Sequence, residues 1–345
     1  MKLDGRDQHF IVVGENVHCT RVLLRKGKRI GPGPDGQEAV LWQDGVGQAR
    51  SLTIPQETTT TSDYQEGRVK HVQIAVKLAM AGAAEAGEAM DYLRHLVSRQ
   101  EQAGVDFLDL NVDEISYKHQ EQLHAMQWLV RTVQSMTDVP LSVDSSLLAT
   151  IDVGIQACAR DVGRRPLLNS ASLERTEPLD LAARHDAQVI ITAAGASGMP
   201  EGSHERVNNA SKMIDMALDK GIELADIHVD LLVFPISVDS RFGLHYLDAV
   251  RPIREKYGPA IHITGGMSNV SFGIPARRLV NEVFINLAID HGADAGILDP
   301  VAGNINSIVA LDRSTPPYKL ARQMLLGEDE HCKHFLRAFR KGELG

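Results

Sequence analysis

The sequence is poor in cysteine, in aromatic residues and in long apolar runs. Cys19, Cys158 and Cys332 are far apart and form no CxxC pair, so their spacing indicates neither a disulfide framework nor a structural zinc site. No stretch approaches the roughly 18 consecutive apolar residues of a membrane span, and the N-terminal MKLDGRDQHFIVV carries charges on both sides of a very short apolar run. We therefore expect a cytoplasmic protein without a signal peptide or membrane segment.

An excess of basic residues is also missing. The 345 residues include 36 Lys and Arg against 45 Asp and Glu, which gives a formal net charge of -9 and a pI near 5.9. Such a chain has no basic field to attract nucleic acid or an anionic membrane. Because 43% of the residues are hydrophobic, a sizeable core is expected, and the expected partners are small molecules or proteins.

Short apolar runs alternate with helical patterns along most of the chain. Helical spacing is clear, for example, at Leu123, Met126, Val130 and Val133. The eight expected strands are 10–13, 107–111, 141–144, 167–170, 189–192, 227–230, 261–264 and 296–300. Parallel neighbours need crossover helices, so this alternation predicts a parallel sheet with buried faces. Its size matches an α/β fold of the (β/α)₈ TIM-barrel type.

A doubly wound sheet is the alternative fold. The barrel is favoured because polar residues follow most of the strands, and barrels place their active sites at the C-terminal ends of all strands. An open sheet needs such residues only at its switch point.

The regular alternation is interrupted by residues 19–82, which we interpret as an insertion after the first strand. Segments 21–24 and 39–42 are predicted to be two strands of a hairpin joined through the turn-rich residues 31–36. The polar stretch 58–61 is a candidate lid, and 72–79 has helical spacing. We expect one domain over 1–345, with a helical tail at 301–345.

Polar side chains, mainly carboxylates and amides, gather at the expected strand ends. They are Glu15, Asn16, His18, Asp109, Asn111, Asp144, Asn169, Asp230, Asn269 and Asp299. A carboxylate accepts two parallel N–H bonds and an amide both donates and accepts, so such a ring suits a flat polar heterocycle. A pterin, a nucleobase and a sugar all remain open on this ground. Asn269, in the glycine-rich segment 265–273 after a strand, is the expected chemical centre.

Several of these strand-end motifs resemble those of a known family. They are Gly-Glu-Asn-Val-His at 14–18, Asp-Leu-Asn-Val at 109–112, Val-Asp-Ser at 143–145, Leu-Asn-Ser at 168–170, Val-Asp at 229–230 and Gly-Gly-Met-Ser-Asn-Val-Ser-Phe-Gly at 265–273. Together they resemble the methyltetrahydrofolate:corrinoid methyltransferases, which include the folate-binding barrel of cobalamin-dependent methionine synthase. The resemblance runs from about residue 10 to residue 300 without the insertion, and the segment around Asn269 is its most specific part.

The resemblance implies a pterin-binding TIM barrel that moves a methyl group between a corrinoid protein and N5 of tetrahydrofolate, in a demethylation or one-carbon pathway. Asn269 would be the catalytic residue that hydrogen-bonds N5, and no metal ligands are expected. The implied pterin-binding residues are Asp144, Asn169, Asp230 and Asn269, with Arg277 from the same loop and Asp109 and Asn111 at the pocket floor.

The resemblance also implies a cobalamin carried by a separate small corrinoid protein, because the family's Asp-x-His-x-x-Gly segment is not found here. A homodimer is the implied assembly.

Two alternative functions remain open. Dihydropteroate synthase shares the barrel and pterin pocket, but that family expects a Ser-Arg-Lys type segment after strand seven, where this chain has Met-Ser-Asn. A folate-binding subunit without catalysis is the second.

Individual residues have alternatives as well. Asp144 and Asp230 are also typical helix caps, and Asn111 and Asn169 typical turn residues. His18 is a rim ligand, a core histidine or a proton donor. The run 331–334 is interpreted as an exposed helical tail rather than a metal site. The basic cluster Arg21, Arg25, Lys26, Lys28 and Arg29 is either a solvated hairpin or a contact for the folate glutamate tail or an acidic partner.

Overall fold

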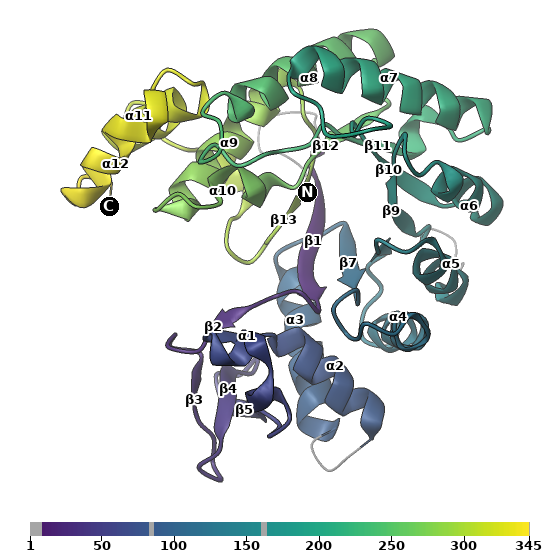
Figure 1. Ribbon diagram of the computed structural model, residues 1–345, viewed down its shortest axis with the longest axis vertical. Helices are drawn as coiled ribbons and strands as arrows, with labels where there is room; N and C mark the ends of the chain where they lie inside the picture. The colour runs from purple at the N-terminus through teal and green to yellow at the C-terminus, as the bar shows by residue number, and fades with distance from the viewer. Residues whose placement is uncertain (1–8, 83–85, 160–163, 345) are drawn as a thin grey trace. The chain divides into compact units, whose positions relative to one another are not determined.

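The computed structural model describes residues 9–82, 86–159 and 164–344 (Figure 1). Residues 1–8, which entered the expectation about a signal peptide, lie outside them. The chain divides into two compact units. The first unit consists of Met1–Gly14, Ala103–Asp106 and Leu167–Gly345, and the second of Glu15–Gln102 and Phe107–Pro166.

Eight strands form one parallel sheet in the order β12-β11-β10-β9-β8-β7-β1-β13. Their bounds are β1 (Ile11–His18), β7 (Phe107–Asn111), β8 (Leu141–Asp144), β9 (Leu167–Ala171), β10 (Gln188–Thr192), β11 (Ile227–Asp230), β12 (His262–Thr264) and β13 (Ala295–Leu298). Each strand lies beside its chain neighbour among the eight, and β13 returns to β1. The backbone N of Ile297 donates to the carbonyl of Gly265 at 3.0 Å, which joins β13 to the end of β12.

This cyclic order is that of a (β/α)₈ barrel, and the predicted fold class is confirmed. A doubly wound sheet would reverse its strand order at a switch point, and this sheet does not. That alternative is therefore wrong.

The first unit pairs its strands in parallel register, with Val12 opposite Gly296 and Val229 opposite Ile263. Residues such as Val189, Ile190 and Ile191 are almost fully buried, as expected for strands covered on both faces. Its helices are α6 (Glu177–His185), α7 (Ser203–Asp219), α8 (Phe242–Tyr257), α9 (Arg277–His291), α10 (Ile305–Val309), α11 (Pro316–Leu325) and α12 (Lys333–Arg340). The last three lie in the tail. In its 331–334 run His331 is exposed whereas Cys332 is buried.

The second unit pairs β7 with β8 in parallel, with Asp109 opposite Ser142 and Asn111 opposite Asp144. Its longer helices are α2 (His71–Ala81), α3 (Ala86–Gln102), α4 (His119–Gln134) and α5 (Leu148–Ala157). Most of the stripe predicted on α4 is buried: Met126, Val130 and Val133 are inaccessible to solvent, whereas Leu123 is half-buried.

The insertion is built differently from the predicted hairpin. An antiparallel sheet takes the strands β3 (Ile30–Pro32), β4 (Glu38–Gln43) and β5 (Ala49–Thr53), while β2 (Leu23–Leu24) pairs with β6 (Arg68–Val69) next to α1 (Ser62–Gln65). Segments 21–24 and 39–42 are therefore not partners, and that prediction is wrong.

The physical reason is the position of the turn. Gly31 and Pro32, expected in the turn, are extended and belong to β3. The chain reverses between Gly33 and Gln37, whose backbone N···O distance is 2.7 Å, and Gly36 supplies the φ of +80° there. Most of the polar stretch 58–61 proposed as a lid is a 3₁₀ helix, Thr58–Thr60, in which the hydroxyls of Thr59 and Thr60 donate to backbone carbonyls three residues earlier.

Within the described residues, no helix combines the length and apolar character needed to cross a bilayer.

Candidate active site

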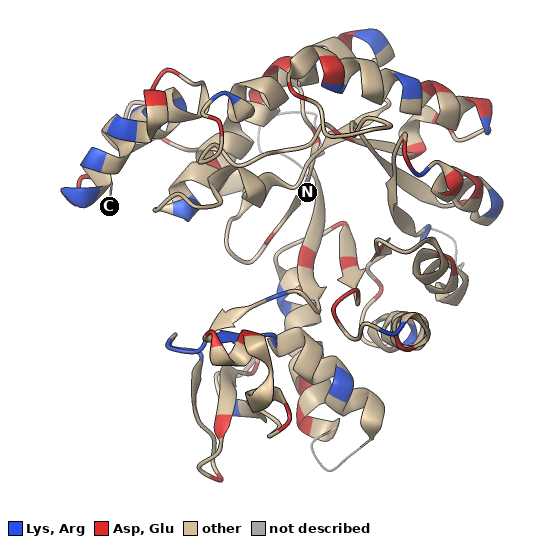
Figure 2. Ribbon diagram, in the orientation of Figure 1, with Lys and Arg blue, Asp and Glu red and all other residues tan. Residues whose placement is uncertain are grey.

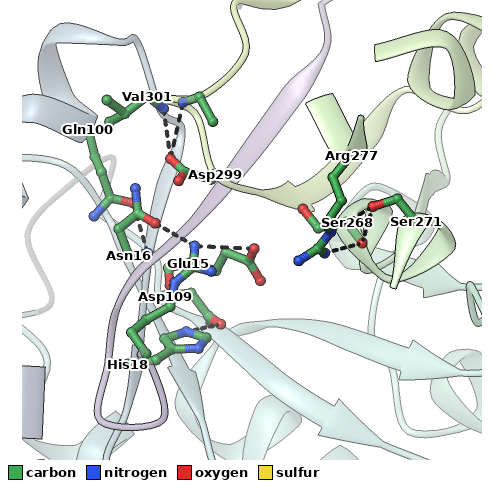
Figure 3. Close-up of polar contacts among 12 residues, drawn as sticks. Glu15, Asn16, His18, Gln100, Asp109, Ser268, Ser271, Arg277, Asp299 and Val301 are labelled. Atoms are coloured by element: carbon green, nitrogen blue, oxygen red, sulfur yellow. Dashed lines mark hydrogen bonds and ion pairs between the residues drawn. The ribbon is translucent and has the colours of Figure 1, made fainter. Parts of the chain in front are cut away.

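In the second unit, the C-terminal ends of β1 and β7 bring His18 and Asp109 together. The Nε2 atom of His18 lies 2.9 Å from Oδ2 of Asp109 (Figure 3). Burial alone would lower the pKa of His18, but the hydrogen bond and charge of Asp109, with the charges of Asp144 and Glu15, raise it above its ordinary value. The pair therefore favours a protonated His18 imidazole hydrogen-bonded to an ionised Asp109 carboxylate.

Asp144, at the end of β8, is the third acid of this group. Its Oδ2 accepts a hydrogen bond from Nδ2 of Asn111 at 2.9 Å. Burial, followed by repulsion from Asp109, raises the pKa of Asp144 to about 7, although His18 and the Asn111 bond favour the anion. A carboxyl of this kind is present at neutral pH both as hydrogen-bond donor and as acceptor.

His18, Asp109 and Asp144 form a compact polar cluster whose ligand-type atoms all lie within 4.8 Å of one another. Oδ1 of Asp109 is buried and has no hydrogen-bond partner in the described part of the chain. The cluster is held by the hydrogen bonds His18–Asp109 and Asn111–Asp144. Groups that can both donate and accept in this way are suited to hydrogen-bonding the edge of a polar ring. The expectation that the chain has no metal ligands stays a prediction.

In the first unit, Asp230 ends β11 and begins a strained turn. Its Oδ1 accepts the backbone N–H of Leu232 at 2.7 Å, and Leu232 adopts a φ of +63°, rare for a residue with a branched side chain. Arg206, fully buried on α7, donates through Nε to the carbonyl of Leu231 at 3.0 Å. The Leu232 bond orients the Asp230 carboxyl, and the Arg206 bond holds the backbone that follows it. Burial raises its pKa to about 6 against the opposing effects of the Leu232 bond and the charge of Arg206.

Asn269 lies in a 3₁₀ turn, Met267–Ser271, that follows β12. Met267 and Val270 are fully buried, whereas Asn269 is exposed, so the two apolar neighbours anchor the turn and leave the amide free. No group among the described residues is hydrogen-bonded to that amide. A Cβ added at Gly266 would lie 2.8 Å from Nδ2 of Asn269, so glycine is needed for the amide to hold its position.

Arg277, the first residue of α9, is tied to the same loop. Its Nε donates to Oγ of Ser271 and its Nη2 to the carbonyl of Ser268, each at 3.0 Å (Figure 3). Its guanidinium also lies 5.8 Å from the ring centre of Phe272. Arg277 thus braces the turn that presents Asn269, a positioning role that the sequence did not suggest.

Two further strand-end residues have simpler settings. Asn169 is half-buried in β9 opposite Ile190 of β10. Asp299, just after β13, accepts the backbone N–H groups of Val301 and Ala302 at 3.0 and 3.3 Å, which is the behaviour of a turn-forming aspartate.

The basic cluster of the insertion, in the blue segment before β3 (Figure 2), is partly neutralised within its own unit. Arg21 donates through Nη2 to Oδ1 of Asn16 at 2.5 Å and to Oε1 of Glu15 at 3.3 Å. Arg25 lies 3.1 Å from both carboxylate oxygens of Glu38. Of the five basic residues, these two are therefore engaged by acceptors of the insertion and strand β1.

The structure thus gathers the predicted site residues in two groups. Asp109, Asn111 and Asp144 form hydrogen-bonded contacts in the second unit together with His18. Asn169, Asp230, Asn269 and Arg277 belong to the first unit, at or just beyond the ends of β9, β11 and β12.

Residues 62–299 match the family model described as "Pterin binding enzyme", which is more than half of the chain. The chain belongs to the pterin-binding enzyme family. The predicted family resemblance is confirmed at this level, and the match ends close to the predicted limit of residue 300. It begins at residue 62 rather than at about residue 10, so β1 and the strands β3, β4 and β5 of the insertion lie outside it.

Among curated proteins, this pterin-binding enzyme is similar to a methylcorrinoid:tetrahydrofolate methyltransferase of Eubacterium limosum. The two are 28% identical over 263 residues, which covers 74% of this chain and 89% of that protein. It is also similar to methionine synthase of Mycobacterium leprae (strain TN), with 27% identity over 231 residues that cover 62% of this chain and 18% of that protein. The chain therefore matches only about a fifth of the methionine synthase's length.

Solved structures support the fold. Dihydropteroate synthase from Xanthomonas albilineans, in complex with 7,8-dihydropteroate, has a TM-score of 0.53 and 16% identity, covering 90% of this chain and 96% of that one. Dihydropteroate synthase from Stenotrophomonas maltophilia has a TM-score of 0.53 and 16% identity, covering 65% and 87%. At such identities the likeness concerns the barrel and not the reaction.

Sequence reasoning missed Arg206, which holds the Asp230 turn. The signal was present, since Arg206 stands on the face of α7 that carries the buried residues Ala210, Met213 and Ala217. A charged residue on an apolar stripe is almost never buried without a polar partner. Gly266 was read only as part of a glycine-rich turn, because a specific contact with Asn269 cannot be derived from spacing.

Proposed function

We propose that this pterin-binding enzyme transfers a methyl group between the cobalt of a corrinoid protein and N5 of tetrahydrofolate. The observation that carries the proposal is the Asn269 amide, exposed and unpartnered among the described residues at the glycine-shaped end of β12. The similarity to the Eubacterium limosum protein gives it a reaction class.

In this proposal Asn269 hydrogen-bonds N5 and is the catalytic residue. Asp144, Asn169 and Asp230 hold the pterin ring, while Asp109 and Asn111 shape the pocket beside Asp144. Asp144 and Asp230 support this role because the raised pKa of each lets its carboxyl either donate to or accept from a ring edge near neutral pH. Arg277 keeps the turn of Asn269 in place through Ser268 and Ser271.

The reaction is a direct displacement at the methyl carbon. Toward folate, the N5 lone pair forms the new N–C bond while the carbon–cobalt bond breaks and its electron pair stays with cobalt, and N5 then releases its proton. In the reverse direction, N5 must carry a proton to leave as a neutral amine. Asn269 does not titrate, so it orients N5 and stabilises the charge that develops there through a fixed dipole.

The corrinoid is proposed to arrive as cobalamin on a separate small protein, as the second substrate of a cytoplasmic homodimer. Binding of that protein in one fixed orientation would supply most of the remaining rate acceleration through positioning.

The test is methyl transfer by the purified protein, with tetrahydrofolate and a methylated corrinoid protein as substrates. We expect methyltetrahydrofolate to form and the corrinoid spectrum to change in parallel. Asn269→Ala is expected to fold normally, because Asn269 is exposed, and to lose about 100- to 1,000-fold in rate, the usual cost of one oriented donor. Asn208→Ala, an exposed amide on α7, is the matched control with unchanged turnover.

Unchanged turnover in Asn269→Ala would reject the assigned role. Condensation of a pterin diphosphate with 4-aminobenzoate would establish dihydropteroate synthase activity instead. Tetrahydrofolate binding without methyl exchange, across several methylcorrinoid proteins, would indicate a binding subunit.

A further inference from the structure

The insertion and α3 line a partly open cavity of about 750 Å³ entirely within the second unit. One wall comes from β4, β5 and the turn between them, and the other from one face of α3. Trp42 and His95 meet across these walls with ring centres 4.7 Å apart. None of the residues proposed for the pterin site lines this cavity.

The charge of the lining is positive, although the whole chain is acidic. Four arginines and two aspartates line the cavity. Two of the arginines are compensated, since Arg50 lies 3.0 Å from Asp44 and Arg94 lies 2.8 Å from Asp91.

The other two arginines have no carboxylate partner in the described part of the chain. Arg29 donates through Nη2 to the hydroxyl of Tyr92 at 2.6 Å, which leaves most of its N–H groups available. Arg99 is exposed on α3 and makes neither a hydrogen bond nor an ion pair with a described residue. Two guanidinium groups that face one cavity without a carboxylate partner are positive charges that a bound anion would neutralise.

The indole of Trp42 adds a further donor to the lining. Trp42 is nine-tenths buried, and its Nε1–H has no hydrogen-bond partner among the described residues. Burial, then the charges of Arg99 and Arg29, lower the pKa of His95 to about 4 against the effect of Asp44, so its imidazole is neutral at pH 7. Guanidinium groups have no acceptor capacity of their own, so Arg29 and Arg99 call for a ligand rich in acceptor oxygens.

We propose that this cavity binds a small phosphate-bearing molecule, with the phosphate held by Arg29 and Arg99. A phosphate offers two negative charges and three acceptor oxygens, which matches two uncompensated guanidinium groups. The volume is far greater than an inorganic ion fills and is typical of sites for small organic molecules. A sugar phosphate or mononucleotide has the appropriate size and charge.

The test uses Trp42 as its reporter. The chain has two tryptophans, Trp42 and Trp128, so Trp128→Phe leaves an indole only in the cavity. We expect a saturable change in Trp42 fluorescence on titration with glucose 6-phosphate and none with glucose. Arg99→Gln in this background is expected to weaken glucose 6-phosphate binding at least about tenfold, because one charge-assisted contact is lost.

Arg94→Gln is the matched control inside the same cavity, since Arg94 is already paired with Asp91, and we expect its affinity to change much less. The proposal is overturned if glucose 6-phosphate gives no saturable response, if glucose gives the same response, or if Arg99→Gln binds as tightly as its parent. Equal binding of citrate with the same dependence on Arg99 would assign the cavity to carboxylates and reject phosphate. No folate or corrinoid takes part, so this result is independent of methyl transfer.

Discussion

At the scale of single residues, Asp230 couples the proposed pterin site to pH. Its pKa in the folded protein is about 6, above the value of about 3.9 for an unperturbed aspartate. The native state therefore holds the proton more tightly than the unfolded chain does. The resulting stabilisation is complete below about pH 4 and is lost as pH rises through about 6.

Asp230→Asn removes this titration and keeps an oxygen that accepts the Leu232 N–H. We expect the variant and the wild type to be similarly stable at pH 4, and the variant to be more stable by about 2 kcal/mol at pH 8. Urea unfolding across this range measures the difference. Asp219→Asn, exposed at the end of α7, is expected to follow the wild-type profile, and a difference for Asp230→Asn that does not vary with pH would contradict the argument.

The polar residues of the candidate site could be singled out one by one from the sequence, but their contacts with one another could not, and their roles in binding stay predictions. Asp109, Asn111, Asp144 and Asp230 were identified because polar residues that end apolar strands stand out in sequence. The His18–Asp109 contact joins residues 91 positions apart, and such a pairing depends on strand order and side-chain direction. The sequence left His18 open between three roles for that reason.

At the scale of elements, the turn after β12 depends on the absence of a side chain at Gly266. Gly266 has a φ of −70°, which alanine adopts without strain, so the effect of Gly266→Ala is steric and local. The added Cβ would stand 2.8 Å from Nδ2 of Asn269 and move the amide. We expect methyl transfer to fall about 10- to 100-fold with the unfolding midpoint little changed.

Gly198→Ala is the control, because a Cβ there meets nothing within 4 Å. Steady-state rates of the two variants measure the effect. Full activity in Gly266→Ala would show that the position of Asn269 does not matter.

The packing of α5 on β8 gives a stability prediction. A Cβ at Gly154 would lie 2.5 Å from Cγ1 of Val143 and 2.9 Å from Cγ of Met126. Alanine is the better helix former by about 1 kcal/mol, but overpacking a tight core costs about 1 to 3 kcal/mol. We expect Gly154→Ala to lower the free energy of unfolding by about 1 kcal/mol.

Gly87→Ala, on α3 with nothing within 4 Å of the added Cβ, is expected to cause no loss, because only the helix-propensity gain remains there. Denaturant unfolding compares the two. A Gly154→Ala variant as stable as Gly87→Ala would mean that the α5–β8 contact relaxes freely.

Elements differed in how well the sequence predicted them. The barrel strands were found because buried parallel strands are continuous apolar runs. The insertion was misread because short antiparallel strands pair according to the position of the turn, and Gly31-Pro32 looked like a turn while forming part of β3. Helix α6 was not predicted. It has only 9 residues and carries a proline in its first turn, so too few apolar residues recur at helical spacing to predict it.

At the scale of the whole molecule, the proposed reaction needs a second macromolecule. We expect methyl transfer with free methylcobalamin to be slower than with a methylated corrinoid protein by more than about 100-fold, because the carrier supplies orientation. Parallel assays at equal cobalamin concentration measure the ratio. Equal rates would indicate that this chain recognises the corrinoid without its carrier.

The barrel itself could be predicted from the count and spacing of its strands, whereas the division into two compact units could not. That division falls between Gly14 and Glu15, within the observed strand β1 but just beyond the strand predicted at 10–13. The long-range contacts that hold each unit together depend on side-chain packing, which the spacing of residues in the sequence does not reveal.

The pairing of β1 with β13 also bears on synthesis of the protein. Ile11 lies opposite Ala295, so β1 can pair with β13 only after the ribosome has translated the roughly 280 residues that separate the two strands. At about 5 to 20 residues per second the wait is roughly 15 to 60 s. Val12 and Val13 are almost completely buried in the finished protein, so the edge of β1 that β13 covers stays unpaired over that interval, when a nascent-chain chaperone has its greatest value.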